Sequence, residues 1–221
     1  MSEHTSSTTS PLLGPTTVTE NPSRFGLAYA GIQVLLLIFL IGVVGIVANA
    51  KWMLFSWHPI LMSLCLVLIS EAVLILQKTT SQTKPTAAIG HRYIMFGVGL
   101  LGVAGVSIIY INKAVNGKPH FTSWHGKLGL TAALLILGQI LFGLTLHYFP
   151  NLFGNLGQAR RLYKRHRLFG YFIFSLMWIN SLLGTQADWM VSQFPKSWIW
   201  YPVIILILLG LWSRVKLSTL K

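Results

Sequence analysis

The sequence of 221 residues is 53% hydrophobic and only 10% charged, and its mean hydropathy is +0.64. This composition excludes a disordered chain and an ordinary soluble domain, and it indicates an integral membrane protein. The formal net charge of +13 does not indicate nucleic-acid binding, because the basic residues lie between apolar runs, as they do in the cytoplasmic loops of polytopic membrane proteins.

The chain begins with a polar segment and continues as a series of apolar runs. Residues 1–23 are rich in Ser, Thr and Pro, so we expect a disordered cytoplasmic tail there. Residues 24–221 hold six runs of about the length that crosses a bilayer as a helix, roughly 20 residues, the last being the shortest. The runs are continuous and rich in Leu and Ile, which predicts an all-α membrane protein with six transmembrane helices. The runs are Phe25–Ala48, Leu54–Leu76, Ala87–Ile111, Trp124–Phe149, Leu168–Ala187 and Trp198–Trp212.

The distribution of Lys and Arg predicts the orientation of these helices. Twelve basic residues fall on the side of the membrane that holds both termini, and five fall on the other side. Because basic residues are enriched in cytoplasmic loops, we expect both termini to be cytoplasmic.

Four histidines lie near the starts of four successive predicted helices, the second to the fifth. Successive helices run in opposite directions, so the starts of helices two and four share one membrane face and the starts of helices three and five share the other. An imidazole at such a depth is costly unless it has a partner, and ionisable residues there are usually functional. The four are His58 and His125 at the non-cytoplasmic level and His91 and His166 at the cytoplasmic level.

Two histidine pairs stacked across the bilayer match the ligand requirement of two bis-imidazole haems held by a central bundle of helices two to five. Neutral imidazole is a common ligand of iron. Zinc requires about four ligands around one ion, which pairs near opposite faces of a core of roughly 30 Å cannot supply. His147 is a reserve ligand at the cytoplasmic level, but it lacks the local sequence that the other histidines repeat.

The sequence around the histidines repeats. Ser-Trp precedes both His58 and His125, and a glycine follows both His125 and His166 by four residues. These glycines, Gly129 and Gly170, would let either a flat macrocycle or a neighbouring helix approach the backbone, and the sequence does not decide between the two. Glu71, an acid within an apolar run, requires a hydrogen-bonding partner.

These motifs resemble the cytochrome b561 family of transmembrane ascorbate-dependent oxidoreductases, from about residue 25 to the C-terminus. The resemblance rests on Phe-Ser-Trp-His-Pro at residues 55–59, on His91, on the segment from His120 to Gly129, and on His166 with Gly170. It is strongest to the small members that contain little beyond the cytochrome b561 domain. The sequence departs from the ascorbate-specific members after helix two and at the start of helix four.

The resemblance implies that two haem b groups are bound per chain, one by His58 with His125 and one by His91 with His166. It implies electron transfer from cytoplasmic ascorbate to monodehydroascorbate or ferric iron on the opposite side. It also implies a homodimer and an ER or endosomal or other vesicle membrane.

Substrate residues are expected at both faces. An anionic donor at the cytoplasmic face requires positive charge, and Arg160, which aligns with a family position at the ascorbate site, is a candidate together with Lys84 and Lys164. On the opposite face His120 is a candidate for contact with the acceptor. Each of these residues could equally serve only topology or loop structure, and no group is expected to act as a catalytic acid, base or nucleophile.

Two other functions are compatible with the sequence. One is a haem-free, proton-coupled transporter that uses the histidines as a relay, although the sequence lacks the interrupted helix pair of ion-coupled carriers. The other is a family member without activity that acts as a membrane scaffold. A b-type haem spectrum separates the oxidoreductase from the transporter.

Overall fold

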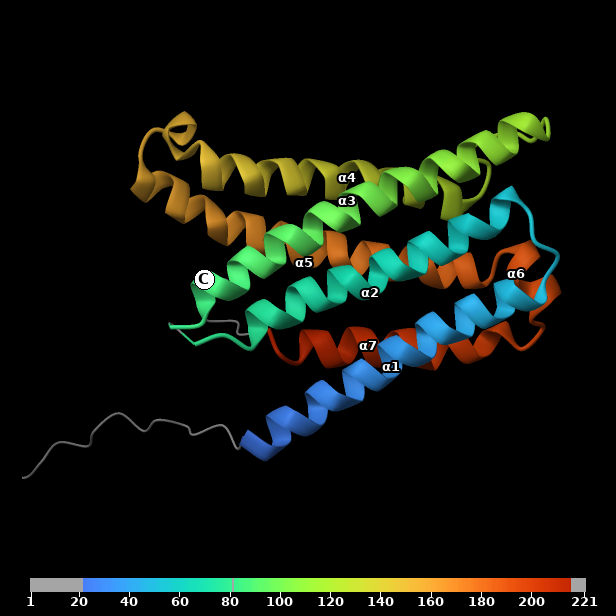
Figure 1. Ribbon diagram of the computed structural model, residues 1–221, viewed down its shortest axis with the longest axis horizontal. Helices are drawn as coiled ribbons and strands as arrows, with labels where there is room; N and C mark the ends of the chain where they lie inside the picture. Colours follow the sequence, from blue (N-terminus) through green and yellow to red (C-terminus); the bar gives the residue numbers. More distant parts are fainter. Residues whose placement is uncertain (1–21, 81, 216–221) are drawn as a thin grey trace, which may run out of the picture.

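A computed structural model describes residues 22–80 and 82–215, and these residues form an all-helical structure. The part of the predicted tail that covers residues 1–21 lies outside the described residues. The long helices lie side by side with their axes roughly aligned (Figure 1). They are α1 (Pro22–Asn49), α2 (Trp57–Gln77), α3 (Lys84–Val115), α4 (Trp124–Tyr148), α5 (Leu156–Thr185) and the shorter α7 (Trp200–Trp212), with 3-10 turns at Leu54–Ser56, Pro150–Phe153 and Ser197–Ile199 and a short helix α6 (Asp188–Gln193).

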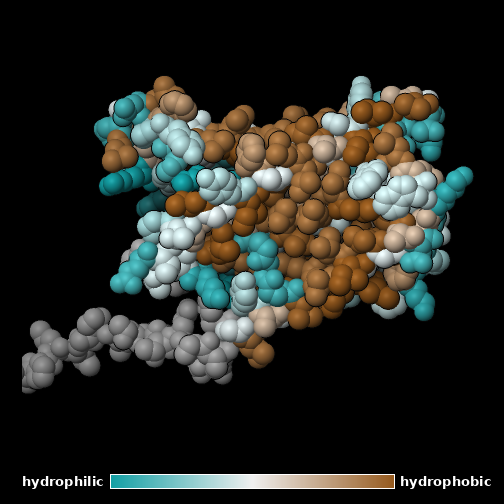
Figure 2. All heavy atoms as spheres, in the orientation of Figure 1, coloured by the Kyte–Doolittle hydropathy of each residue, from teal (hydrophilic) through white to brown (hydrophobic). Residues whose placement is uncertain are grey.

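Five helical segments among the described residues are long and apolar enough to cross a membrane, and the last apolar helix is shorter. The chain is therefore a multi-pass membrane protein. The thirteen residues of α7 extend about 20 Å, which is less than the hydrocarbon core of roughly 30 Å. A broad apolar band lies between two polar ends (Figure 2).

The outer faces of α3 and α4 carry large apolar side chains that are exposed. Leu100 is 60% exposed on α3, and Leu134 and Leu141 are each 63% exposed on α4. Such a surface is unfavourable in water and favourable against lipid.

The fifth helix is longer than the sequence predicts. Its apolar run was expected to begin at residue 168, but α5 begins at Leu156, because the basic segment before the run is also helical. A capping box starts the helix: the backbone N–H of Gln158 donates to Oδ1 of Asn155 at 2.9 Å, and the backbone N–H of Asn155 donates to Oε1 of Gln158 at 3.1 Å. Hydropathy could not detect this part of the helix, because its residues are polar.

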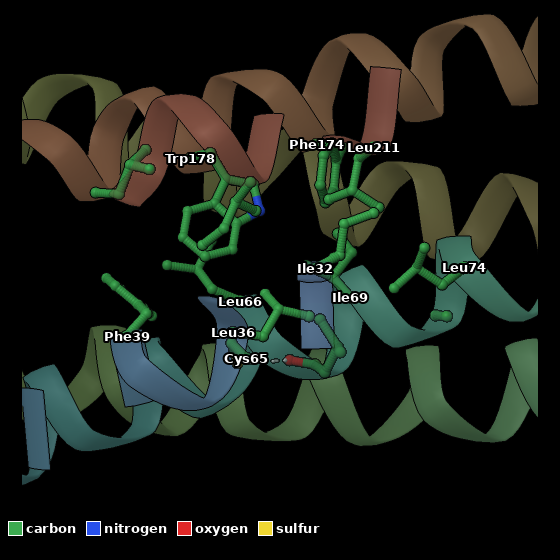
Figure 3. Packing of buried hydrophobic residues seen from close by; sticks show 14 of the residues in the cluster. Ile32, Leu36, Phe39, Cys65, Leu66, Ile69, Leu74, Phe174, Trp178 and Leu211 are labelled. Carbon is green, nitrogen blue, oxygen red and sulfur yellow. Dashed lines mark hydrogen bonds between the residues drawn. The ribbon is translucent and has the colours of Figure 1, made fainter. Parts of the chain in front are cut away.

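The core joins α1 and α7 to the bundle of α2, α3, α4 and α5. Helix α2 packs on α3, α4 packs on α5, and α1 packs on both α2 and α7. Figure 3 shows Leu36 and Phe39 of α1 beside Leu66 of α2 and Trp178 of α5. Trp178 is fully buried, and its Nε1–H donates to the hydroxyl of Ser70 at 3.3 Å.

Both ends of the bundle are defined by the connections between helices. The α2–α3 and α4–α5 connections lie at the end where α1 begins and α7 finishes, and the α1–α2 and α3–α4 connections lie at the other (Figure 1). The end that holds the start of α1 is the one for which the sequence predicts the cytoplasm.

Candidate functional site

His58 and His125 face each other at the non-cytoplasmic end of the bundle. Each is the second residue of its helix, α2 or α4. Their ring centres are 6.3 Å apart and the ring planes are inclined at 75°. Two imidazoles that bind one metal ion through bonds of about 2 Å hold their ring centres about 6 Å apart. The separation of the two rings therefore fits a pair of ligands on opposite sides of one ion.

Backbone carbonyl groups fix the tautomer of three of the four histidines. Nδ1 of His58 lies 2.9 Å from the carbonyl oxygen of Gly105, and Nδ1 of His125 lies 3.0 Å from that of Asn180. Nδ1 of His91 lies 2.8 Å from the carbonyl oxygen of Ala72. A carbonyl oxygen only accepts hydrogen bonds, so each Nδ1 carries the proton and each Nε2 keeps a lone pair. Histidines that bind metals are commonly oriented in this way.

His91 and His166 form the second level, toward the predicted cytoplasmic end. They lie close enough for an electrostatic interaction between the two imidazoles. The ring of His166 is flanked by Phe142 at 6.0 Å and Tyr163 at 6.5 Å between ring centres. Nδ1 of His166 is buried and has no hydrogen-bond partner among the described residues, in contrast to the other three histidines.

The sequence placed all four histidines near helix starts, and this was wrong for two of them. His91 lies seven residues after the start of α3, and His166 lies ten residues after the start of α5. Both helices begin with polar turns that extend beyond the apolar run. The position of a histidine in the helix therefore does not give its depth in the apolar segment, because the helix can extend beyond that segment.

The two levels are far apart along the bundle. The ring of His166 lies against Gly143 of α4, and Gly143 is eighteen residues after His125. At 1.5 Å per residue this is about 27 Å along α4, close to the thickness of the hydrocarbon core. Within residues 22–80 and 82–215, no group of three or more His, Cys, Asp or Glu side chains converges on one point. The described histidines of α2 to α5 therefore lie at two separate levels of the bundle, and the described residues form no cluster that could give zinc three or four protein ligands.

The predicted substrate residues lie at the expected ends of the bundle. Lys84 is the first residue of α3, and Arg160 and Lys164 belong to the first turns of α5, and all three side chains are exposed. His120 lies in the α3–α4 connection at the opposite end and stacks on Tyr110, with ring centres 4.2 Å apart and planes inclined at 22°.

Three residues that lie near one another at the cytoplasmic level were not predicted from the sequence to form a group. Nη1 of Arg92 donates to Nδ1 of His147 at 3.2 Å, and the charge of Arg92 also acts on Tyr163. The three residues come from α3, α4 and α5. Arg92 directly follows His91, and Tyr163 precedes His166 by three residues. This closeness in sequence to two predicted ligands could have identified Arg92 and Tyr163 as candidate site residues.

Glu71, Gly129 and Gly170, which were noted in the sequence, each lie against a side chain of a neighbouring helix. Oε1 of Glu71 accepts a 2.6 Å hydrogen bond from Nε2 of Gln33 on α1. A Cβ atom on Gly129 would lie 3.1 Å from Nδ2 of Asn180, and one on Gly170 would lie 3.3 Å from Nε2 of Gln139. Gly129 and Gly170 therefore allow close packing of α4 and α5.

Comparisons with known proteins identify the family of the chain. The family model for eukaryotic cytochrome b561 matches residues 57–191, which include all four histidines. Transmembrane reductase CYB561D2 of Bos taurus is 30% identical over 168 residues, which cover 73% of this chain and 74% of the relative.

Two plant proteins are also similar. Ascorbate-specific transmembrane electron transporter 1 of Zea mays is 28% identical over 145 residues, covering 65% of this chain and 60% of the relative. Transmembrane ascorbate ferrireductase 1 of Arabidopsis thaliana is 25% identical over 138 residues, covering 62% and 56%. Because this family model matches more than half of its length, the chain belongs to the cytochrome b561 family.

Proposed function

We propose that the protein is a di-haem b-type transmembrane reductase. It takes electrons from cytoplasmic ascorbate and delivers them to monodehydroascorbate or ferric iron on the lumenal or extracellular side. The observation that carries this proposal is the pair His58 and His125, whose rings are 6.3 Å apart and whose Nδ1 atoms are both held by backbone carbonyls. The names of the plant relatives support the donor and one of the acceptors.

His58 and His125 would hold the haem of the non-cytoplasmic level, and His91 and His166 would hold that of the cytoplasmic level. A bis-histidine haem has no open coordination position and exchanges single electrons. The protein contributes the neutral Nε2 ligands, because the carbonyls of Gly105, Asn180 and Ala72 keep the proton on Nδ1 of three of the histidines.

The donor would bind at the cytoplasmic level against Arg92, His147 and Tyr163. Ascorbate is an anion at neutral pH, and a guanidinium group offers several N–H donors to an anionic oxygen. Within the described part of the chain no carboxylate pairs with Arg92, and its guanidinium group donates a hydrogen bond to His147. The side chain is half-buried, which strengthens its interaction with an anion.

The exposed Arg160, Lys84 and Lys164 would act outside this group of residues. Their charges lie at the same end of the bundle and would raise the local concentration of an anionic donor. In this proposal they attract the donor but do not bind it directly. A comparison of Arg160→Gln with Arg92→Gln distinguishes this attraction from direct binding by Arg92.

The acceptor would bind at the opposite end near His120. Tyr110 supports one face of the His120 ring, and Nζ of Lys113 donates to the carbonyl oxygen of Pro119 at 3.0 Å, which ties the preceding residue to α3. The half-buried imidazole thus has a fixed position in the loop, as a contact for a chelated ferric ion or a radical anion requires.

The predicted orientation gives the direction of electron flow. The excess of basic residues at the end with both termini supports a cytoplasmic location for that end. An ER or endosomal or other vesicle membrane is the proposed site of action.

Proteoliposomes test the proposed function directly. Purified protein is reconstituted with ascorbate trapped inside and a membrane-impermeant ferric chelate outside. The proposal expects ferrous product to appear outside only when the protein and internal ascorbate are both present. Equal rates in protein-free vesicles would contradict it.

A further inference from the structure

Helices α4 and α5 carry the same four-position pattern, in which a histidine is followed by a glycine, an amide side chain and a second glycine. The offsets from the histidine are 4, 14 and 18 residues in both helices. In α4 the residues are His125, Gly129, Gln139 and Gly143, and in α5 they are His166, Gly170, Asn180 and Gly184.

Because the two helices are antiparallel, the histidine of each helix lies beside the second glycine of the other. A Cβ atom on Gly184 of α5 would lie 2.8 Å from Cε1 of His125, and a Cβ atom on Gly143 of α4 would lie 2.8 Å from Cε1 of His166. Real Cβ atoms essentially never lie so close to another heavy atom. Each imidazole ring therefore lies directly against the backbone of the opposite helix, at a glycine, where a hydrogen atom takes the place of a side chain.

The backbone carbonyl one turn earlier completes the contact for His125. Asn180 precedes Gly184 by four residues, so both lie on the same face of α5. The carbonyl of Asn180 accepts from Nδ1 of His125, while Gly184 contacts the Cε1 edge of the same ring. Two adjacent contacts on one helix thus restrict both the position and the rotation of the ring.

The other helix pair repeats only the carbonyl contact. His58 bonds the carbonyl of Gly105, fourteen residues after His91, and His91 bonds that of Ala72, fourteen residues after His58. The positions equivalent to the second glycine are Leu76 and Ile109 in this pair. The glycine contact is therefore a separate feature of α4 and α5 and not a consequence of antiparallel packing alone.

We propose that Gly184 and Gly143 are positioning residues, each of which sets the ring orientation of the histidine on the opposite helix and so controls one of the two haem sites. Gly184 serves the site of His125, and Gly143 serves the site of His166. This inference rests on the proposed ligation of haem by these histidines. A glycine within a helix costs about 0.5–1 kcal/mol relative to alanine, so its presence at both positions needs a local reason, and the ring contact supplies one.

The first test compares Gly184→Ala and Gly143→Ala with Gly138→Ala. Gly138 is a matched control on α4, because a Cβ atom there would meet nothing within 4 Å. Haem content is measured by pyridine haemochrome and the two low-spin ferric centres by low-temperature EPR, with His125→Ala and His166→Ala to assign the signals. We expect each glycine variant to fall from about two haems to about one, and Gly138→Ala to keep both.

The identity of the lost signal distinguishes positioning from a general packing defect. Gly184→Ala should lose or shift the same EPR signal as His125→Ala, and Gly143→Ala the same signal as His166→Ala. Two unchanged signals, or equal loss of both signals in either variant, would overturn the inference. If the wild-type protein binds no haem, both the proposed function and this inference are wrong. If the wild-type protein binds two haems and the glycine variants have the same haem content and EPR signals as the wild type, only this inference is wrong.

A second test uses stability and needs no bound haem. If the added methyl group collides with the imidazole ring, Gly184→Ala should lower the thermal midpoint by about 5 °C in the wild-type background. In the His125→Ala background, where the ring is gone, the same change should no longer lower the midpoint and should raise it slightly, because alanine favours a helix over glycine. Poor folding of Gly184→Ala should likewise be rescued by His125→Ala. Equal effects in the two backgrounds would show that the glycine does not act through the ring.

Discussion

Nδ1 of His125 on α4 lies 3.0 Å from the carbonyl oxygen of Asn180 on α5, so the backbone of one helix fixes the tautomer of a histidine on the next. The hydrogen bond leaves Nε2 unprotonated and available to a metal. Because the ring of His58 is held in the same way from α3, two neutral imidazoles converge from separate helix pairs.

The first prediction concerns this pair. His58→Ala and His125→Ala should each reduce the haem content from about two per chain to about one, because an iron left with one imidazole binds weakly. The double variant should lose no more than either single variant, because both changes remove the same site. Haemochrome stoichiometry measures this, and His147→Ala is the control that should retain both haems. Additive loss to zero in the double variant would contradict the pairing.

The second prediction concerns Arg92. Arg92→Gln should raise the ascorbate concentration needed for half-maximal reduction about tenfold, which corresponds to about 1.4 kcal/mol of binding free energy. Arg92→Lys should recover part of the loss, because a lysine keeps the charge but not the planar fork of donors. Reduction by dithionite should be unchanged in both variants.

Arg160→Gln is the comparison for that experiment. It removes one positive charge from the same end of the bundle but leaves the hydrogen bond between Arg92 and His147 intact. A much smaller effect, which disappears at high salt, is expected. A larger effect from Arg160→Gln than from Arg92→Gln would place the donor at the start of α5 instead.

The helix boundaries could be predicted from the sequence only where they coincide with the ends of apolar runs. Apolar runs locate the buried part of each helix, and the ends of α4 agree with the prediction to within one residue because Ser123 caps the start, its hydroxyl accepting from the backbone N–H of Gly126 at 3.1 Å. The polar start of α5 was missed because a charged helix outside the apolar band has no hydropathy maximum.

The surroundings of the histidines were predictable only in part. Alternation of helix direction is sufficient to bring His58 and His125 to one level. The contact of Gly184 with His125 was not predicted, because it depends on the register between α4 and α5, although the equal spacing of the four positions in both helices is visible in the sequence. The hydrogen bond between Gln33 and Glu71 depends on which face α1 presents to α2, and several faces of α1 are equally apolar.

The third prediction tests that hydrogen bond. Glu71→Leu should destabilise the protein by about 1–3 kcal/mol, because Nε2 of Gln33 would lose its acceptor within the bundle. Glu71→Gln should be close to wild type, since an amide oxygen can accept the same bond. Thermal unfolding in detergent measures both variants. A Glu71→Gln variant as unstable as Glu71→Leu would show that the negative charge, and not the hydrogen bond, is required.

The fourth prediction concerns orientation. Cys65 is buried and is the only cysteine of the sequence, so a Cys65→Ala background allows single reporter cysteines to be labelled. Arg161→Cys, near the start of α5, should react with an impermeant maleimide only from the cytoplasmic side. Lys118→Cys, in the α3–α4 connection, should react only from the opposite side. Labelling of both reporters from one side would contradict the topology.

The most direct test of the central claim is a dithionite-reduced minus oxidised spectrum of the purified protein, with haem stoichiometry, repeated after addition of ascorbate. The account predicts a b-type spectrum with about two haems per chain, part of which ascorbate alone develops. Two haems that ascorbate fails to reduce would contradict the proposed donor while leaving the ligands in place. A protein without haem would contradict the reductase assignment and favour the histidine-relay transporter.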